Sequence, residues 1–203
     1  MASFLNRKAW GYAEDQMVTT HPIRGPVANT TVADSIFDGI TYSKGAATMK
    51  QLLYLMREEN FGKALSVYFH KYEFNNATLS DFMAEMQNQF EVKEFTLEEW
   101  RALWLEKASL NQIDPSWNPA DNSAEAKITV KMTAFTKEHP TLRPHKVKIA
   151  LFMGDLSVDV LEHLLQPKEI NEIKYDGSKG YKAILLNYED HTFVKNNIDQ
   201  VSR

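Results

Sequence analysis

Apolar residues recur at helical spacing through the first half of the chain. Between Asp34 and Lys107 they stand three and four positions apart, as they do along one face of an α-helix. Tyr72–Ala77 interrupts the repeat and is predicted to be a loop. The pattern predicts four helices, marked by Ala46, Met49, Leu53 and Met56; by Phe61, Leu65, Tyr68 and Tyr72; by Phe82, Met83 and Met86; and by Leu97, Trp100, Leu103 and Trp104.

Two of these helices have a recognisable beginning. Thr78 is followed three residues later by Asp81, and Thr96 by Glu99. In a capping box, the hydroxyl accepts a hydrogen bond from a free backbone N–H, and the acidic side chain reaches back to the capping residue. We therefore expect helices to begin immediately after each threonine.

The period changes after Ala108. Residues 128–134 alternate apolar and polar side chains, and residues 147–151 do the same, which is typical of strands with one wet face. Two more strands are expected at 183–186 and 192–194, joined by a hairpin turn at 187–190. Residues 111–123 contain Asp-Pro and Asn-Pro pairs and are predicted to be a linker.

A run of helices followed by a run of strands indicates an α+β chain with two structural units. The expected division places a helical unit at residues 1–108 and a small β-sandwich at residues 109–203.

Composition excludes several kinds of protein. The 203 residues contain no cysteine, so disulfides, thiolate metal sites and a cysteine nucleophile are ruled out. No apolar run approaches the roughly 20 residues of a membrane helix. The net charge of −4 argues against a nucleic-acid binder that works by charge attraction. The lack of cysteine and of a secretory signal fits a reducing compartment, so the expected location is the cytoplasm.

The histidines do not predict a metal site. None of the six stands in an H-E-x-x-H motif, and no two lie four apart on a predicted helix. Phosphate-binding loops, dinucleotide-binding motifs and G-x-S-x-G elbows are missing as well. We therefore expect ordinary surface or core histidines, and no metal ligands in this chain.

One junction is unusual. Tyr42 stands where a loop becomes a helix, and Gly45 falls in the first helical turn, where alanine would be about 1 kcal/mol better. Such a glycine predicts that another backbone approaches closely. A tyrosine at a helix beginning most often packs its ring and bonds its hydroxyl, so Tyr42 by itself remains open to a structural role.

Phe37–Ala46 resembles the F-D-x-I-x-Y-x-K-G-A motif of the zinc aminopeptidase N family of gluzincin metallopeptidases. Other stretches resemble the family in the same order, and Ser109 follows the last helix where glycine is usual. The resemblance covers nearly the whole chain, through Trp10–Gln16, Thr20–Ile23, Tyr68–Tyr72, Asn75–Phe82, Trp104–Ala108 and Pro140–His145.

The resemblance implies the helical, C-terminal part of a thermolysin-like catalytic domain followed by the β-sandwich. Met1–Leu5 resembles the residues just after the family's third zinc ligand, so the chain is expected to start immediately downstream of the zinc site. The family's H-E-x-x-H and G-A-M-E-N motifs are missing from this sequence. Zinc is thus expected in the full-length enzyme, and none is expected on this fragment.

The resemblance also implies a catalytic role for Tyr42. In the family, the matching hydroxyl points at the scissile carbonyl oxygen, which becomes anionic when zinc-bound water attacks. A phenol is a hydrogen-bond donor at neutral pH, and one fixed donor is typically worth ~10²–10³ in turnover. Phe37 is placed to line the pocket for the first side chain of the substrate.

Two functions follow as expectations. In the first, the chain is a fragment of a metallo-aminopeptidase that removes N-terminal residues from peptides, and is inactive alone. Its partners are then a peptide substrate and the missing zinc-bearing and C-terminal helical parts of the same enzyme, with no nucleic acid and no membrane span. In the alternative, the chain is a non-catalytic binding or scaffold module derived from an aminopeptidase.

Overall fold

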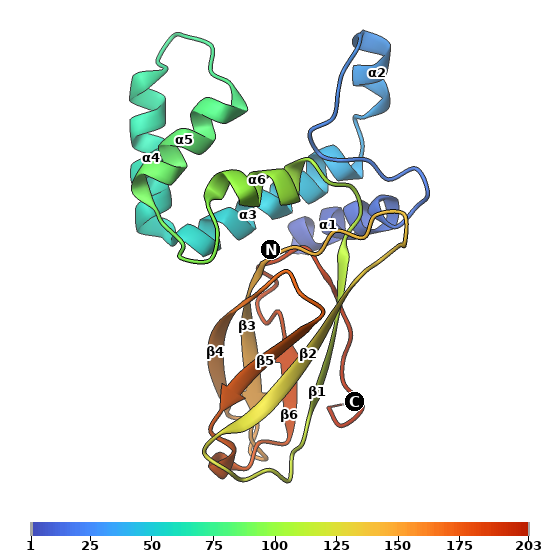
Figure 1. Ribbon diagram of the computed structural model, residues 1–203, viewed down its shortest axis with the longest axis vertical. Helices are drawn as coiled ribbons and strands as arrows, with labels where there is room; N and C mark the ends of the chain where they lie inside the picture. Colours follow the sequence, from blue (N-terminus) through green and yellow to red (C-terminus); the bar gives the residue numbers. More distant parts are fainter. Residues whose placement is uncertain (1, 203) are drawn as a thin grey trace.

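The computed structural model describes residues 2–202 and has an α+β architecture, as expected. Helices gather at one end of the molecule and strands at the other (Figure 1). The helical part consists of α1 (Ala2–Asp15), α2 (Thr30–Ser35), the π-helical turn η1 (Ile40–Lys44), α3 (Gly45–Met56), α4 (Glu58–Lys71), α5 (Leu79–Gln89) and α6 (Leu97–Leu105).

Both predicted capping boxes are confirmed. Thr78 Oγ1 accepts from the Asp81 backbone N–H at 3.2 Å, and Thr96 Oγ1 accepts from the Glu99 N–H at 3.1 Å. Each acid returns a hydrogen bond to the backbone N–H of its threonine. α5 and α6 therefore begin where the sequence predicts. The four predicted helices are α3 to α6, and Trp100 and Trp104 lie in their core, each 1% exposed.

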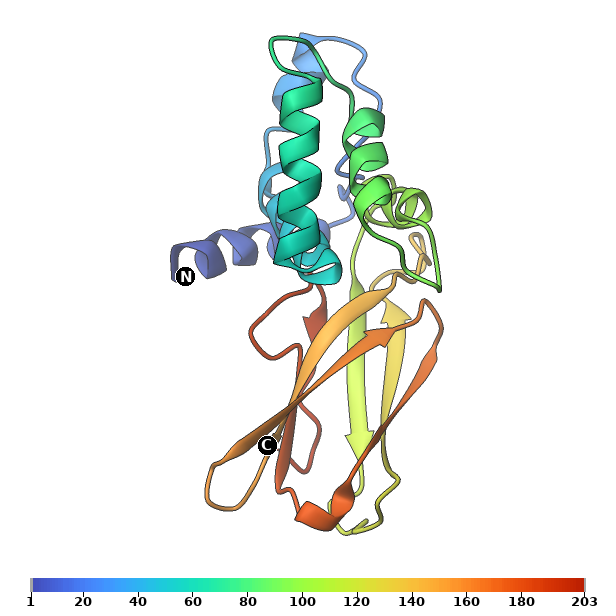
Figure 2. The ribbon, with the colours of Figure 1, turned by 90° about the vertical axis from the view of Figure 1, so that its left-hand side faces the viewer.

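The strands form two sheets whose inner faces share one apolar core. The first sheet has the order β5-β2-β1-β7 and the second has the order β4-β3-β6. Figure 2 shows both sheets below the helices. Their members are β1 (Asn111–Trp117), β2 (Ala126–Ala134), β3 (His145–Phe152), β4 (Val158–Leu165), β5 (Ile170–Tyr175), β6 (Ala183–Leu186) and β7 (Lys195–Asn196), with a short 3₁₀ helix, η2 (Gly177–Lys179), before β6.

The predicted linker at residues 111–123 is wrong, because its first seven residues form β1. This strand pairs antiparallel with β2 along its whole length, with Pro115 opposite Val130. On its other side β1 meets β7 only at Gln112 and Ile113. Pro115 therefore lies where that second side of β1 has no strand partner, and this is the position at which a sheet tolerates a proline.

The predicted hairpin at residues 187–190 is also wrong. The turn itself exists, but the chain beyond it leaves the sheet that contains β6. Asn187, Glu189 and Asp190 all have positive φ angles, and the side chain of Asn187 bonds back to Thr192. The last strand, β7, then pairs parallel with β1 in the other sheet.

The two ends of the molecule share a core. Phe193 follows the strands in sequence, but it is fully buried among the helices, where its ring stacks on Tyr12 at 4.2 Å between centroids. The Tyr12 hydroxyl also donates to the Val194 carbonyl oxygen at 3.1 Å and accepts from the Val194 N–H at 3.2 Å. Residues 192–194 thus connect the sheets to α1.

Candidate functional site

Tyr42 lies in η1, directly before α3, so the loop-to-helix junction is where the sequence places it. Its side chain is 50% exposed, and its ring contacts Phe37, which is 65% exposed, at 5.4 Å between centroids. Trp10 of α1, 41% exposed, has a ring atom 3.0 Å from where a Cβ on Gly39 would stand. The phenol therefore stands on the surface beside the exposed ring of Phe37.

Two carboxylates capture the free backbone N–H groups at the beginning of η1. Asp38 Oδ1 accepts from the N–H groups of Ile40 at 3.0 Å and Thr41 at 2.9 Å. Glu14 Oε2 accepts from the N–H of Gly39 at 2.5 Å. The first N–H groups of a helix lack partners within the helix, and side-chain acceptors fix its beginning. The backbone before Tyr42 is held in this way from two sides.

His21 binds the second oxygen of Asp38. Its Nε2 lies 2.6 Å from Asp38 Oδ2, and its Nδ1 lies 2.9 Å from the carbonyl oxygen of Pro22. Partial burial by itself would lower the pKa of His21, but the hydrogen bonds to Asp38 and to the Pro22 carbonyl outweigh it and raise the pKa above its ordinary value. Both ring nitrogens face acceptors, so the doubly protonated imidazolium fits this site best.

Lys44 and Asp15 form a fully buried ion pair behind η1. Lys44 Nζ lies 3.0 and 2.9 Å from the two carboxylate oxygens of Asp15, and it also donates to the carbonyl of Ser109 at 2.9 Å. Burial lowers the pKa of Lys44 to about 8, although Asp15 opposes the shift. Thr20 donates to the same carboxylate at 2.8 Å. This pair fixes the end of η1 to α1.

Close backbone contact occurs at two glycines other than Gly45. A Cβ on Gly11 would stand 3.0 Å from the Gly39 carbonyl oxygen, and a Cβ on Gly39 would stand 3.1 Å from the Gly11 nitrogen. The predicted close approach at Gly45 is wrong, because a Cβ there would meet only the side chain of Ile23, at 3.8 Å. α1 thus contacts the turn that carries Tyr42 through Gly11 and Gly39, and not through Gly45.

Sequence reasoning located Tyr42 but missed the residues that hold it. Glu14, His21, Asp38 and Lys44 all lie inside the stretches that resemble the aminopeptidase family, and that was the available signal. Their roles depend on contacts between residues far apart in sequence. The contact between Asp15 and Lys44, for example, joins residues 29 positions apart. Spacing along one segment does not show such contacts.

The described residues do not offer a metal site. Within residues 2–202, no three His, Asp or Glu side chains group closely enough to hold an ion. His145 is fully buried in contact with Thr192 and Asn111, and burial, together with the nearby charge of Arg143, lowers its pKa to about 3. Over the same residues, no helix is both long and apolar enough to span a bilayer.

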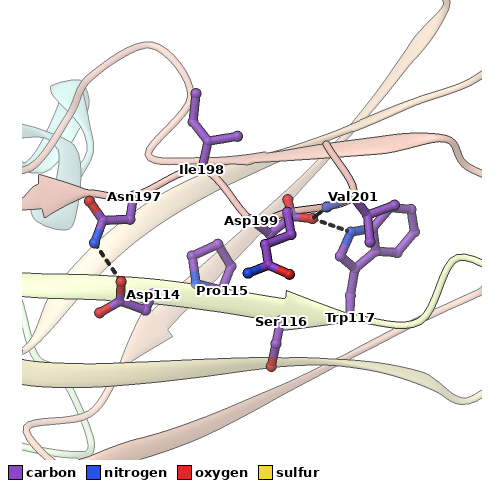
Figure 3. A pocket seen from close by; sticks show the side chains of 9 residues that line it. Asp114, Pro115, Ser116, Trp117, Asn197, Ile198, Asp199 and Val201 are labelled. Atoms are coloured by element: carbon purple, nitrogen blue, oxygen red, sulfur yellow. Dashed lines mark hydrogen bonds between the residues drawn. The ribbon is translucent and has the colours of Figure 1, made fainter. Parts of the chain in front are cut away.

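A separate cleft of about 440 Å³ lies in the strand-rich part, between β1 and residues 197–201 (Figure 3). Asn197 donates to Asp114 at 2.5 Å, and Trp117 donates to Asp199 at 3.1 Å across it. No helix contributes to its lining, and Tyr42 is not part of it. These contacts connect the C-terminal segment to β1.

Comparison with known proteins gives a consistent result. Residues 2–100 match the peptidase family M1 domain. The chain is 31% identical to aminopeptidase N of Streptomyces lividans over 98% of its own length and 24% of that protein. It is 37% identical to human glutamyl aminopeptidase over 59% of the chain and 14% of the relative. A probable aminopeptidase 2 of Sulfurisphaera tokodaii is 33% identical over 42% of the chain and 11% of the relative.

The chain spans about a quarter or less of the length of these relatives. All three are aminopeptidases by name, and the similarity to the Streptomyces protein runs through both the helices and the strands. The matched family domain contains the whole segment from α1 to the beginning of α6, and with it the turn that holds Tyr42. The chain is therefore a member of peptidase family M1, related to aminopeptidase N.

Proposed function

We propose that this chain is part of a zinc aminopeptidase that removes N-terminal residues from peptides, and that Tyr42 is its contribution to the chemistry. The observation that carries the proposal is the half-exposed Tyr42 side chain on a turn held by Asp38, Glu14 and Lys44. A surface phenol fixed at its base is arranged to meet a ligand, whereas a packing tyrosine would be covered.

The proposed role of Tyr42 is to donate its hydroxyl proton, as a hydrogen bond, to the carbonyl oxygen of the scissile peptide bond. Negative charge develops on that oxygen during hydrolysis, and a donor already in place stabilises it without reorganisation. The exposed ring of Phe37 supplies an apolar wall beside the phenol. Tyr42 thus stabilises the transition state, and Phe37 contacts the substrate.

Zinc belongs to this proposal as an ion held by other parts of a longer enzyme. The residues described here do not fit a zinc site, since no group of three suitable side chains exists among them. The chain alone is expected to bind no stoichiometric zinc and to be inactive. Its partners would be the peptide and the zinc-bearing and C-terminal helical parts of the same enzyme. The cytoplasm is the proposed location.

The same proposal assigns the architecture in finer terms. Residues 1–108 would be the distal helical part of a thermolysin-like catalytic domain, and residues 109–203 a β-sandwich packed under it. Supporting this, the two sheets share one apolar core, formed by residues such as Ile128 of β2 and Ile149 of β3.

A chimera tests the proposal. The matching quarter of the Streptomyces aminopeptidase N is replaced by this chain, and hydrolysis of aminoacyl p-nitroanilides is measured together with zinc content. Tyr42→Phe should lower kcat by ~10²–10³ with zinc content and KM nearly unchanged. Tyr68→Phe, on α4, is the matched control and should keep the parent rate.

Two outcomes would contradict the proposal. Parent-like kcat in the Tyr42→Phe chimera would remove the tyrosine from the chemistry. Zinc-dependent turnover by the purified 203-residue chain would contradict the expectation that the metal is held elsewhere. A chimera that folds and binds zinc but never hydrolyses peptides would favour a binding or scaffold module.

A further inference from the structure

One residue, Asp38, binds three successive residues of the turn that carries Tyr42, two through its side chain and one through its backbone. Asp38 Oδ1 accepts from the N–H groups of Ile40 and Thr41, and the Asp38 carbonyl oxygen accepts from the Tyr42 N–H at 3.1 Å. The position of Asp38 therefore sets the path of the backbone up to Tyr42. Whatever orients Asp38 also orients the phenol.

His21 is the side chain that orients Asp38. It holds Oδ2 at 2.6 Å, so that Oδ1 is left free to face the turn. The ring of His21 is itself fixed by the Pro22 carbonyl at 2.9 Å, and a proline next to it restricts the backbone. The contact is also partly buried, because the side chains of His21 and Asp38 are only 26% and 22% exposed.

We propose that His21 and Asp38 form a positioning pair for Tyr42, and that protonation of His21 tightens the turn. The inference rests on the proposed function, since it gives the pair a role in placing the catalytic hydroxyl. When His21 is an imidazolium, both nitrogens donate, one to Asp38 and one to Pro22. When His21 is neutral, one of these hydrogen bonds is lost and Asp38 has more freedom to rotate.

The other charged side chains near the pair have partners of their own. The positive charge of Lys44 in η1 disfavours the proton on His21, but Lys44 is held by Asp15 of α1. Glu14, also of α1, is bonded to Gly39 and to the Trp10 indole. Arg24, three residues after His21, is paired with Glu106. Asp38 is thus the acidic group that His21 bonds directly.

A titration of the chain followed by nuclear magnetic resonance tests the pair without any enzyme activity. The His21 ring signals give its own midpoint. The amide signals of Ile40 and Thr41 and the ring signals of Tyr42 should shift with that same midpoint. A His21 that merely fills space would titrate without moving them.

Two variants sharpen the test. His21→Gln retains one donor for Asp38 but does not titrate, so the pH-dependent step in the Tyr42 signals should disappear while circular dichroism stays native. Asp38→Asn should move the His21 midpoint to lower pH. His70→Gln, an exposed histidine on α4, is the matched control and should leave the step unchanged.

The inference is overturned if the Ile40, Thr41 and Tyr42 signals stay flat through the His21 titration of the unmodified chain. It is equally overturned if the step persists in His21→Gln. Either result leaves the proposed role of Tyr42 to the chimera assay. Conversely, a Tyr42→Phe chimera with full kcat removes the catalytic role and leaves the measured coupling in place.

Discussion

Gly11 of α1 crosses Gly39 so closely that a Cβ on Gly11 would stand 3.0 Å from the Gly39 carbonyl oxygen. The same Cβ would lie 3.0 Å from the Ser43 Cβ, so backbone and side chain both have to move. We expect Gly11→Ala to lower the free energy of unfolding by ~1–3 kcal/mol, measured by urea denaturation.

Gly62 is the matched control for this variant. It also lies within a helix, α4, but a Cβ there would meet no heavy atom within 4 Å. Gly62→Ala should therefore stabilise the protein, by roughly 0.5–1 kcal/mol, because alanine has the better helix propensity. If both variants stabilise, α1 and η1 are not in tight contact.

The buried Lys44–Asp15 pair predicts a large loss when one charge is removed. Lys44→Met leaves Asp15 buried without its partner and should cost about 3–5 kcal/mol of unfolding free energy. Replacing both residues, with Asp15→Leu added, should recover part of the loss. The exposed Lys63–Glu59 pair is the control, and Lys63→Met should barely move the urea midpoint.

The cap of α6 predicts a moderate and chemically specific effect. Thr96→Ala removes the acceptor for the Glu99 N–H and should cost about 1 kcal/mol. Thr96→Ser retains a hydroxyl at the same position and should stay close to the unmodified chain. Stability is measured by thermal or urea unfolding. An equal loss of stability in both variants would assign the effect to the missing methyl group instead.

His145 predicts how stability depends on pH. Its pKa is lowered to about 3 by burial, against an ordinary value of 6.5. At pH values between these two, the His145 ring is protonated in the unfolded chain and neutral in the folded chain. The contribution of His145 is therefore present above pH 6.5 and is lost as the pH falls, by up to about 1.4 kcal/mol per pH unit.

Between pH 6 and pH 4, His145→Gln should reduce the slope of unfolding free energy against pH by close to the contribution of one proton, about 1.4 kcal/mol per pH unit. The measurement is a series of urea titrations at fixed pH. His70→Gln, at an exposed position, should retain the slope of the unmodified chain. An unchanged slope in His145→Gln would show that this histidine is protonated in the folded state.

Local chemistry was enough to predict the helices whose buried faces are apolar. The threonine caps predict where α5 and α6 begin, and the spacing of apolar residues predicts which face of each helix is buried. α1 was not predicted, because its buried positions include Lys8 at 2% exposure and Asp15 at 0%. A helix that buries charges does not show the usual apolar stripe, and only the partners of those charges explain it.

The strands show the same limit. β2 and β3 alternate clearly and were predicted, whereas β4 turns Val158 and Val160 outward and β5 buries the polar Asn171. The pairing of β7 with β1 connects residues about 80 positions apart, which no local pattern encodes. For the site, the motif located Tyr42, but the positions of His21, Asp38 and Asp15 depended on how distant segments meet.

Phe193 has a consequence for how the chain is made. Its ring completes the helical core against Tyr12, and the Tyr12–Val194 hydrogen bonds span 182 positions. Closing so long a loop is slow compared with forming α3 to α6. During synthesis α1 can therefore complete its contacts only after residues 193 and 194 have been made, so the native helical core is finished after translation of β1 to β6.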